Sequence, residues 1–171
     1  TARRWLSPRQ PILRDMPASA VYAAEDQWSA VLDRGGVVDF FGSRIDVPLQ
    51  RRFADCASVQ RYVDAVLTLE SVRATYPKAG PVTVREREGQ TRAHYEPETI
   101  AIPMRTTWAG RECVVLHELA HHCACSDGVP ASRTDRRWHG TDFQAAMLLL
   151  VTEVLGESAA LLLRAGYDAA G

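Results

Sequence analysis

The stretch His117-Glu118-Leu119-Ala120-His121 decides how the rest of the chain is interpreted. It lies in an apolar run, 112–124, that is typical of a helix. On a helix, residues four apart lie nearly above one another, so both imidazoles project from one face and can bind one metal ion. Glu118 lies about 100° further round the helix, where it can reach a water on that ion without displacing it. The pentad therefore predicts a hydrolytic metal site with Glu118 as the catalytic base.

A catalytic zinc ion needs three protein ligands and one open position for water, so a third ligand must lie elsewhere. Asp127 stands where an elongated motif would place a third histidine, but it is an aspartate without the expected preceding glycine. Cys113 lies one turn before His117, and a straight helix rises about 12 Å from Cys113 to His121, too far for residues on three consecutive turns to converge on one ion. Cys113 is therefore expected in the core or in the layer of residues that surrounds the metal ligands.

His139 and Glu153 are the remaining candidates for the third ligand. His139 stands where a polar loop meets the next helix, and Gly140 beside it allows a close backbone approach. Glu153 lies inside that helix, where one glutamate on an amphipathic surface is commonplace. We therefore favour His117, His121 and His139 as the zinc ligands, with Glu153 as the alternative to His139.

The composition is that of an ordinary globular protein. The chain has 171 residues, of which 46% are hydrophobic and 24% charged, and its formal net charge is -1. This length fits one domain with a sizeable core. The charge balance gives no strong signal for nucleic acid or for an anionic membrane as a partner. The longest strongly apolar run, 145–151, is too short to span a bilayer, so we expect no membrane association.

The N-terminal residues and the cysteines indicate the cytoplasm. Residues 1–17 carry three prolines and interspersed charges where a signal peptide needs an apolar core. The four cysteines form no obvious disulfide framework and are expected to be reduced thiols. Cys123 and Cys125 are a weak candidate for a second metal site, because no matching pair stands elsewhere in the chain.

Hydrophobic periodicity predicts a single α+β domain over residues 18–171, preceded by an irregular arm over residues 1–17. The expected helices cover 18–33, a stretch through 72 with Ser58 as its N-cap, 112–124, a stretch through 154 capped by Thr141 or Asp142, and 158–165. The expected strands form a hairpin, 37–41 with 44–47, and an antiparallel meander of 82–85, 91–95 and 99–102. The polar segment 126–138 is expected to be a loop.

The string Val115 to His122, followed by His139-Gly140-Thr141-Asp142-Phe143, resembles the zincin metallopeptidases. It is most similar to the SprT-like and related minimal zincins, in which a His-Gly-x-x-aromatic element follows the pentad. It also resembles actinobacterial HExxH metallohydrolases of no assigned substrate. The resemblance covers about the second half of the chain, and residues 1–80 match no pattern.

The resemblance implies a small zincin-like domain, in which helices pack on a short antiparallel sheet with its edge strand beside the motif helix. Strand 99–102 fits that edge, which in zincins pairs with an extended peptide substrate. The expected function is a zinc-dependent metallopeptidase, in which the zinc-activated water attacks a carbonyl and Glu118 transfers its proton to the leaving amine. The expected partner is a peptide or protein substrate.

Other classes of function stay open at this point. The same activated water can hydrolyse an amide or ester of a small molecule, which a deep, closed pocket favours. A non-catalytic zinc-binding interaction module is favoured by a fourth ligand, such as Cys123 or Cys125. The pentad can also be plain helical surface. A hydrolase usually needs a further group that stabilises the oxyanion, and the candidates are Tyr95, His94, Tyr167 and His122.

Overall fold

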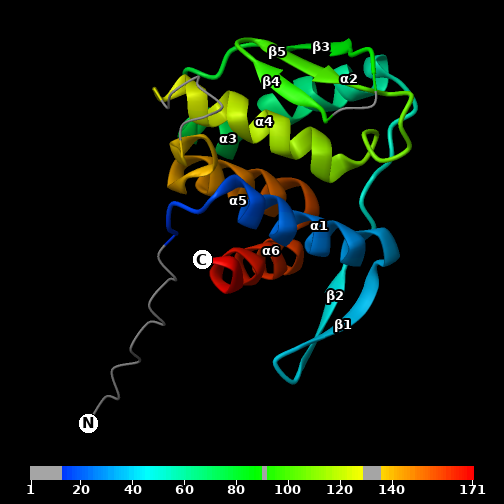
Figure 1. Ribbon diagram of the computed structural model, residues 1–171, viewed down its shortest axis with the longest axis vertical. Coiled ribbons are helices and arrows are strands. Elements are labelled where there is room, and N and C mark those ends of the chain that lie inside the picture. The colour runs from blue at the N-terminus through cyan, green and yellow to red at the C-terminus, as the bar shows by residue number, and fades with distance from the viewer. Residues whose placement is uncertain (1–12, 90–91, 129–135) are drawn as a thin grey trace.

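In the computed structural model, which describes residues 13–89, 92–128 and 136–171, the chain has a mixed α+β fold, as predicted (Figure 1). The helices are α1 (Ala18–Arg34), α2 (Cys56–Leu67), α3 (Glu70–Thr75), α4 (Glu112–Ser126), the 3-10 helix η1 (Arg136–His139), α5 (Thr141–Leu155) and α6 (Glu157–Ala170). The strands are β1 (Gly36–Phe40), β2 (Ser43–Val47), β3 (Thr83–Glu86), β4 (His94–Glu96) and β5 (Thr99–Ile102).

Helix α4, which carries the pentad, lies in the middle of the fold. The sheet of β3, β4 and β5 covers one side of it together with α2, and α5 packs on the other side (Figure 1). Every residue from Glu112 to Ala124 except Val114 is buried. This is the pattern of a helix packed all round rather than of an amphipathic surface helix. The alternative that the pentad is plain helical surface is therefore wrong.

The three-stranded sheet differs from the predicted antiparallel meander. Its strand order is β3-β5-β4, with β3 parallel to β5 and β4 antiparallel to β5. The tight turn is the one between β4 and β5, where Glu98 has a φ of 61°, so that pair forms the hairpin. Strand β3 therefore pairs with the other side of β5. Strand β5 is therefore central, and its expected place at the edge beside the motif helix is wrong; the edge strand that contacts α4 is β4.

The outer edge of β3 is covered by one side chain of α2. The Gln60 amide donates to the carbonyl oxygen of Val82 at 2.9 Å, and Val84 N donates to Gln60 Oε1 at 2.7 Å. These two bonds mimic the pairing of a further strand. Among the described residues, no strand pairs with the outer side of β4. The sheet therefore offers its open edge on the side of β4.

The helix expected through 72 is broken into α2 and α3, and the other predicted helices recur with shifted ends. Helix α2 begins earlier than expected because the N-cap is Asp55, whose carboxylate accepts from Ser58 N at 2.7 Å, so Ser58 is not the cap. Helix α5 has Gly140 as its N-cap instead of Thr141 or Asp142, and the carboxylate that reaches its first turn is Asp15, 3.2 Å from Thr141 N. Helix α6 continues to Ala170. Residues 1–12 of the expected arm lie outside the described residues.

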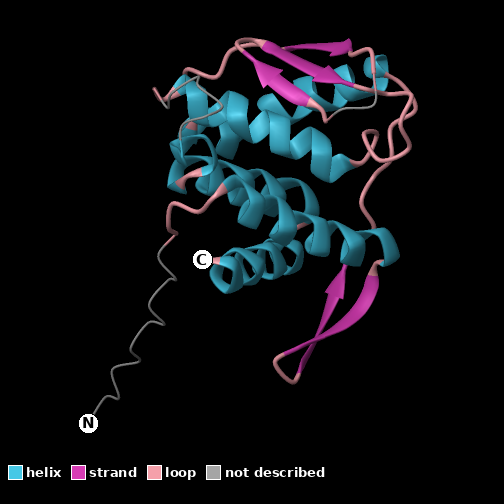
Figure 2. Ribbon diagram, viewed as in Figure 1, coloured by secondary structure: helices cyan, strands magenta, loops and turns pink. Residues whose placement is uncertain are grey.

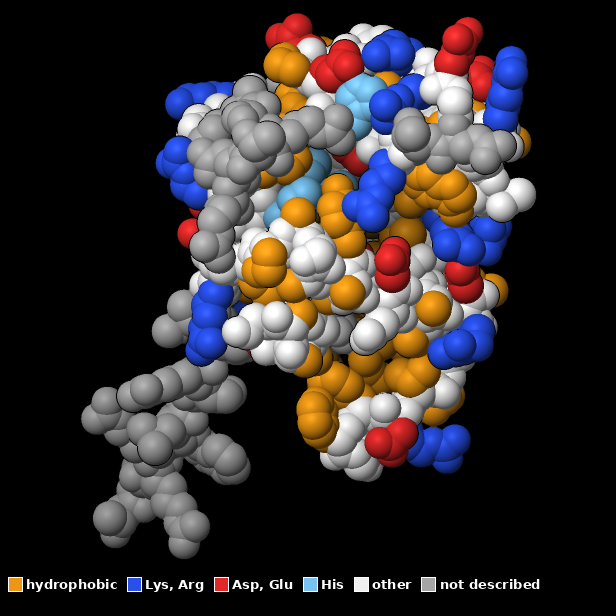
Figure 3. All heavy atoms as spheres, viewed as in Figure 1, with side chains coloured by type: hydrophobic (Ala, Val, Ile, Leu, Met, Phe, Trp, Pro, Cys, Tyr) orange, Lys and Arg blue, Asp and Glu red, His pale blue; other side chains and the backbone are white. Residues whose placement is uncertain are grey.

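The β1–β2 hairpin projects from the helical end of the molecule (Figure 2). Its tip carries Phe41, 91% exposed, and Val37 on β1 is 57% exposed. Figure 3 shows hydrophobic side chains gathered over this projection. The hairpin is far along the chain from the pentad and contributes no side chain to the histidine cluster described below.

In the part of the chain that the structure describes, every helix is too short or too polar to traverse a lipid bilayer.

Candidate metal centre

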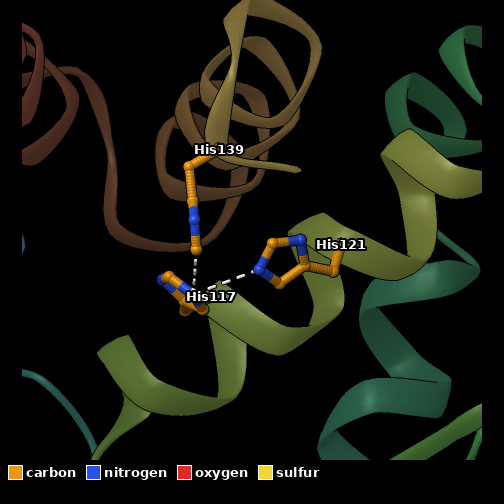
Figure 4. A group of neighbouring side chains, drawn as sticks. All are labelled: His117, His121 and His139. Carbon is orange, nitrogen blue, oxygen red and sulfur yellow. Dashed lines mark hydrogen bonds between the residues drawn. The ribbon is translucent and has the colours of Figure 1, made fainter. Parts of the chain in front are cut away.

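Three buried histidines from two neighbouring segments converge on one point (Figure 4). His117 and His121 project from consecutive turns of α4, and His139 comes from the end of η1, immediately before α5. The Nε2 atom of His117 lies 3.2 Å from Nε2 of His121 and 3.2 Å from Nε2 of His139. All three ligand atoms lie within 4.8 Å of one another. The chain thus brings together the three residues predicted as ligands.

This arrangement fits a divalent metal such as zinc. Zn–N bonds of about 2.0–2.1 Å in a tetrahedral site place ligand nitrogens about 3.3 Å apart, close to the two short separations here. Among the described residues, no cysteine or carboxylate belongs to the same group. Three protein ligands leave one coordination position for water, which is the pattern of catalytic rather than structural zinc.

The alternative ligands lie elsewhere. Glu153 is exposed on α5 and is not part of the histidine cluster. All four cysteines are free thiols, and burial raises the pKa of Cys113 and of Cys123 to about 12, so both are protonated at neutral pH. The Cys113 sulfur lies 3.0 Å from Ser29 Oγ, in the core as expected. A second metal site at Cys123 and Cys125 is not among the possible sites that the described residues form.

A buried carboxylate from α1 holds the ring of His117. Glu25 Oε2 lies 2.6 Å from His117 Nδ1, and the Tyr167 hydroxyl of α6 donates to Glu25 Oε1 at 2.6 Å. A histidine that binds metal through one nitrogen commonly has a carboxylate on the other. Burial alone lowers the pKa of His117, but the charge and hydrogen bond of Glu25 outweigh it and raise that pKa above its ordinary value. The Glu25 contact leaves Nε2 directed at the other two histidines.

Aromatic rings surround the three imidazoles. Phe143 of α5 lies against all of them, with ring centroids 4.4 Å to 5.0 Å away. Trp138 stacks on His121 at 4.2 Å, and Tyr22 of α1 stacks on His117 at 5.2 Å. Tightly packed rings hold the imidazoles in fixed rotamers and keep the dielectric constant low. The site is thus preorganised by packing.

A pocket of about 210 Å³ opens beside His117 and contains Glu118. We call it the Glu118 pocket; its walls include Tyr22, Arg92, Ala93, Trp108 and Val114. The Arg92 guanidinium lies over the Tyr22 ring, 4.1 Å from its centroid. Burial raises the pKa of Tyr22, and the negative charge of Glu118 raises it further, so this phenol keeps its proton. The pocket therefore combines a carboxylate beside the histidines with two hydrogen-bond donors.

The four residues predicted as oxyanion stabilisers have other contacts. His94 pairs with Glu96 at 2.6 Å, and Tyr167 donates to Glu25. His122 contacts the Gly80 carbonyl oxygen at 2.7 Å and the Tyr95 hydroxyl at 3.3 Å, and burial lowers its pKa. None of the four lines the Glu118 pocket.

Sequence reasoning missed the residues that α1 contributes. The sequence predicts a helix over 18–33 but does not mark Glu25 or Tyr22 as site residues, because nothing local in the sequence connects α1 with α4. One signal was available: Tyr22 and Glu25 are three residues apart, so they share one helix face, and a glutamate on an otherwise apolar face needs a partner.

Comparisons of this chain with protein-family models, curated proteins and solved structures found no match.

Proposed function

We propose that the chain is a zinc-dependent hydrolase of the metallopeptidase class, with Glu118 as the general base. The observation that carries this proposal is the convergence of three buried imidazoles beside a pocket that contains a glutamate from the same helix. A purely structural zinc site needs no such carboxylate and usually has a fourth protein ligand. The proposal extends the expectation from the pentad to the whole arrangement of α1, α4 and η1.

Each residue near the site has a distinct task in peptide hydrolysis. Bound zinc supplies an acidified water and a Lewis acid. Glu118 accepts a proton from the water as its oxygen bonds to the carbonyl carbon, and it delivers that proton to the leaving nitrogen as the C–N bond breaks. The Tyr22 hydroxyl and the Arg92 guanidinium are the donors available to the developing oxyanion. Glu25 keeps His117 in orientation throughout.

A peptide substrate is supported by the surroundings of β4. The Glu118 pocket adjoins the residues just before this strand, Arg92 and Ala93. A second pocket, of about 540 Å³, is lined by β4 itself and by Trp138, which stacks on His121. One pocket thus lies beside His117 and the residues before β4, and the other lies along β4 itself. An extended chain paired with that edge places its peptide bonds along the site; the expected pairing with β5 is excluded because β5 is central.

A small-molecule amide or ester is the second candidate substrate. The observation that favours it is the size of the Glu118 pocket, whose 210 Å³ lies below the range of about 300–1,000 Å³ that is usual for drug-sized ligands. Such a pocket suits a short acyl or amine group. A small substrate of this kind makes no contact with the second pocket. Its cleavage therefore does not depend on residues that flank the bond, as cleavage of a peptide paired with β4 does.

The experiment compares the wild-type chain with Glu118→Gln. Both proteins are loaded with zinc, their metal content is measured, and both are incubated with a mixed peptide library analysed by mass spectrometry. Glu118→Gln should bind the same amount of zinc and lose hydrolysis by about 10²–10⁴-fold, because only the proton transfer is removed. Equal cleavage by both proteins, or no cleavage by the zinc-loaded wild type, overturns the proposal.

A further inference from the structure

We infer that the Glu118 pocket selects substrates with an apolar side chain next to the bond that is cleaved. This inference rests on the proposed peptidase function and adds its specificity. The residues that carry it are Trp108, Val114, Cys113 and Ala93, which are the apolar residues among those that line the pocket; we call them its apolar wall. None of these side chains is needed to hold a metal or to move a proton.

The apolar wall lies directly beside the reacting groups. Val114 is one helical turn before Glu118 on α4, so both side chains project from the same face. Val114 is also the one residue between 112 and 124 that is not buried, although its neighbours on every side of the helix are. Trp108 precedes α4 and packs against the core beside it. A side chain that enters the pocket therefore lies next to the carboxylate that handles the proton.

The size of the pocket matches one side chain rather than a whole ligand. Its 210 Å³ is too small for a drug-sized molecule but has room for a leucine or phenylalanine side chain. Transfer of such a side chain from water to an apolar wall is favourable, whereas a charged side chain loses hydration there. The expected preference is about tenfold to a hundredfold in kcat/KM.

The charges around the pocket disfavour an anionic side chain. Its lining carries three carboxylates, Glu25, Asp26 and Glu118, against one guanidinium, Arg92. Both oxygens of Glu25 are already paired, one with His117 and the other with Tyr167. Glu118 is the base of the proposed reaction. Cationic side chains are the strongest competitors because carboxylates outnumber cations in the lining, and the test includes them.

The test uses peptides that differ at one position. Fluorogenic peptides carry leucine, phenylalanine, alanine, aspartate or lysine on either side of one scissile bond, and kcat/KM is measured with the zinc-loaded chain. Binding of the same peptides to Glu118→Gln is measured by fluorescence anisotropy, which needs no turnover. The leucine and phenylalanine peptides should exceed the aspartate and lysine peptides by about tenfold or more in both measurements.

Two variants test whether the pocket is responsible. Val114→Phe fills the pocket and should shift the preference from phenylalanine to alanine. Val37→Phe makes the same substitution on the exposed hairpin strand β1 and should leave the preference unchanged. Trp108→Ala removes part of the apolar lining and should reduce the preference for the leucine and phenylalanine peptides over the aspartate and lysine peptides.

The possible results separate this inference from the function on which it rests. Cleavage that depends on Glu118 but shows no apolar preference, or a preference for lysine or aspartate, overturns the pocket inference alone. The pocket inference is also overturned if Val114→Phe has the same side-chain preference as the wild type. Absence of any Glu118-dependent cleavage overturns the proposed function, and in that case the anisotropy measurement still decides whether the pocket prefers apolar side chains.

Discussion

Two buried side chains in series, Tyr167 and Glu25, orient His117. Tyr167 donates to one oxygen of Glu25, and the other oxygen contacts His117 Nδ1, both at 2.6 Å. Because all three residues are buried, solvent is a poor substitute for either contact. The carboxylate contact at Nδ1 directs Nε2 toward His121 and His139. The strength of metal binding is thus expected to depend on a hydroxyl that touches no histidine.

Replacement of Tyr167 by phenylalanine should weaken metal binding. Glu25 loses its second partner and is free to turn away from His117, so the Kd for zinc should rise about 10–100-fold in competition with a chromophoric chelator. The matched control is Tyr22→Phe, which keeps its ring against His117 and removes the other tyrosine hydroxyl near the site. That variant should keep the wild-type Kd and lower kcat by about 10²–10³-fold, as expected for an oxyanion donor. An unchanged Kd in Tyr167→Phe contradicts the positioning role.

At the scale of elements, the sequence predicts what is local and misses what is not. The motif helix was expected at 112–124 and occupies Glu112–Ser126, because its apolar run and pentad are continuous in sequence. Alternation predicts four of the five strands to within one residue, whereas the strand expected at 91–95 is His94–Glu96. The pairing of the strands depends on the Glu98 turn and on Gln60 of α2, which alternation does not encode. At the site, His139 is marked by its place beside Gly140. Glu25 is 92 residues from His117, and only the tertiary fold brings them together.

The start of α4 is fixed by a second buried carboxylate. Glu112 is fully buried and accepts hydrogen bonds from Arg51 N at 2.7 Å, from the Arg51 guanidinium at 2.6 Å and from the Tyr62 hydroxyl of α2 at 2.6 Å. Burial, followed by the charge of Glu112, raises the pKa of Tyr62, so the phenol remains a donor. Helix α4 is thereby attached to α2 and to the segment before it, which positions the pentad relative to the sheet.

Loss of the Tyr62 hydroxyl should destabilise the fold without changing the metal site. Tyr62→Phe removes one hydrogen bond to a buried carboxylate, which lowers the free energy of unfolding by about 1.5–3 kcal/mol. Urea denaturation monitored by circular dichroism measures this change. Zinc stoichiometry should remain that of the wild type, because Tyr62 contacts no ligand. A stability equal to that of the wild type would show that Glu112 is adequately satisfied by Arg51 alone.

At the scale of the whole molecule, the histidine cluster lies between α4 and the start of α5. Helix α4 packs against the sheet on one side and against α5 on the other, and His139 enters from the segment that leads into α5 (Figures 1 and 4). Helices α1 and α6 add Glu25 and Tyr167 from below. An ion held by these histidines crosslinks α4 to the start of α5, so metal binding and global stability should be linked.

Removal of the metal should therefore lower the unfolding temperature of the entire chain. A ligand that binds only the folded state at a concentration 100 times its Kd adds about 2.7 kcal/mol of stability, which for a protein of this size raises Tm by about 5–10 °C. Differential scanning calorimetry of the EDTA-treated chain, with and without added zinc, measures the difference. His139→Ala should abolish the zinc-dependent rise because only two ligands remain, whereas Glu118→Gln should retain it. If zinc leaves the Tm of the wild type unchanged, or raises that of His139→Ala equally, then the three histidines do not share an ion.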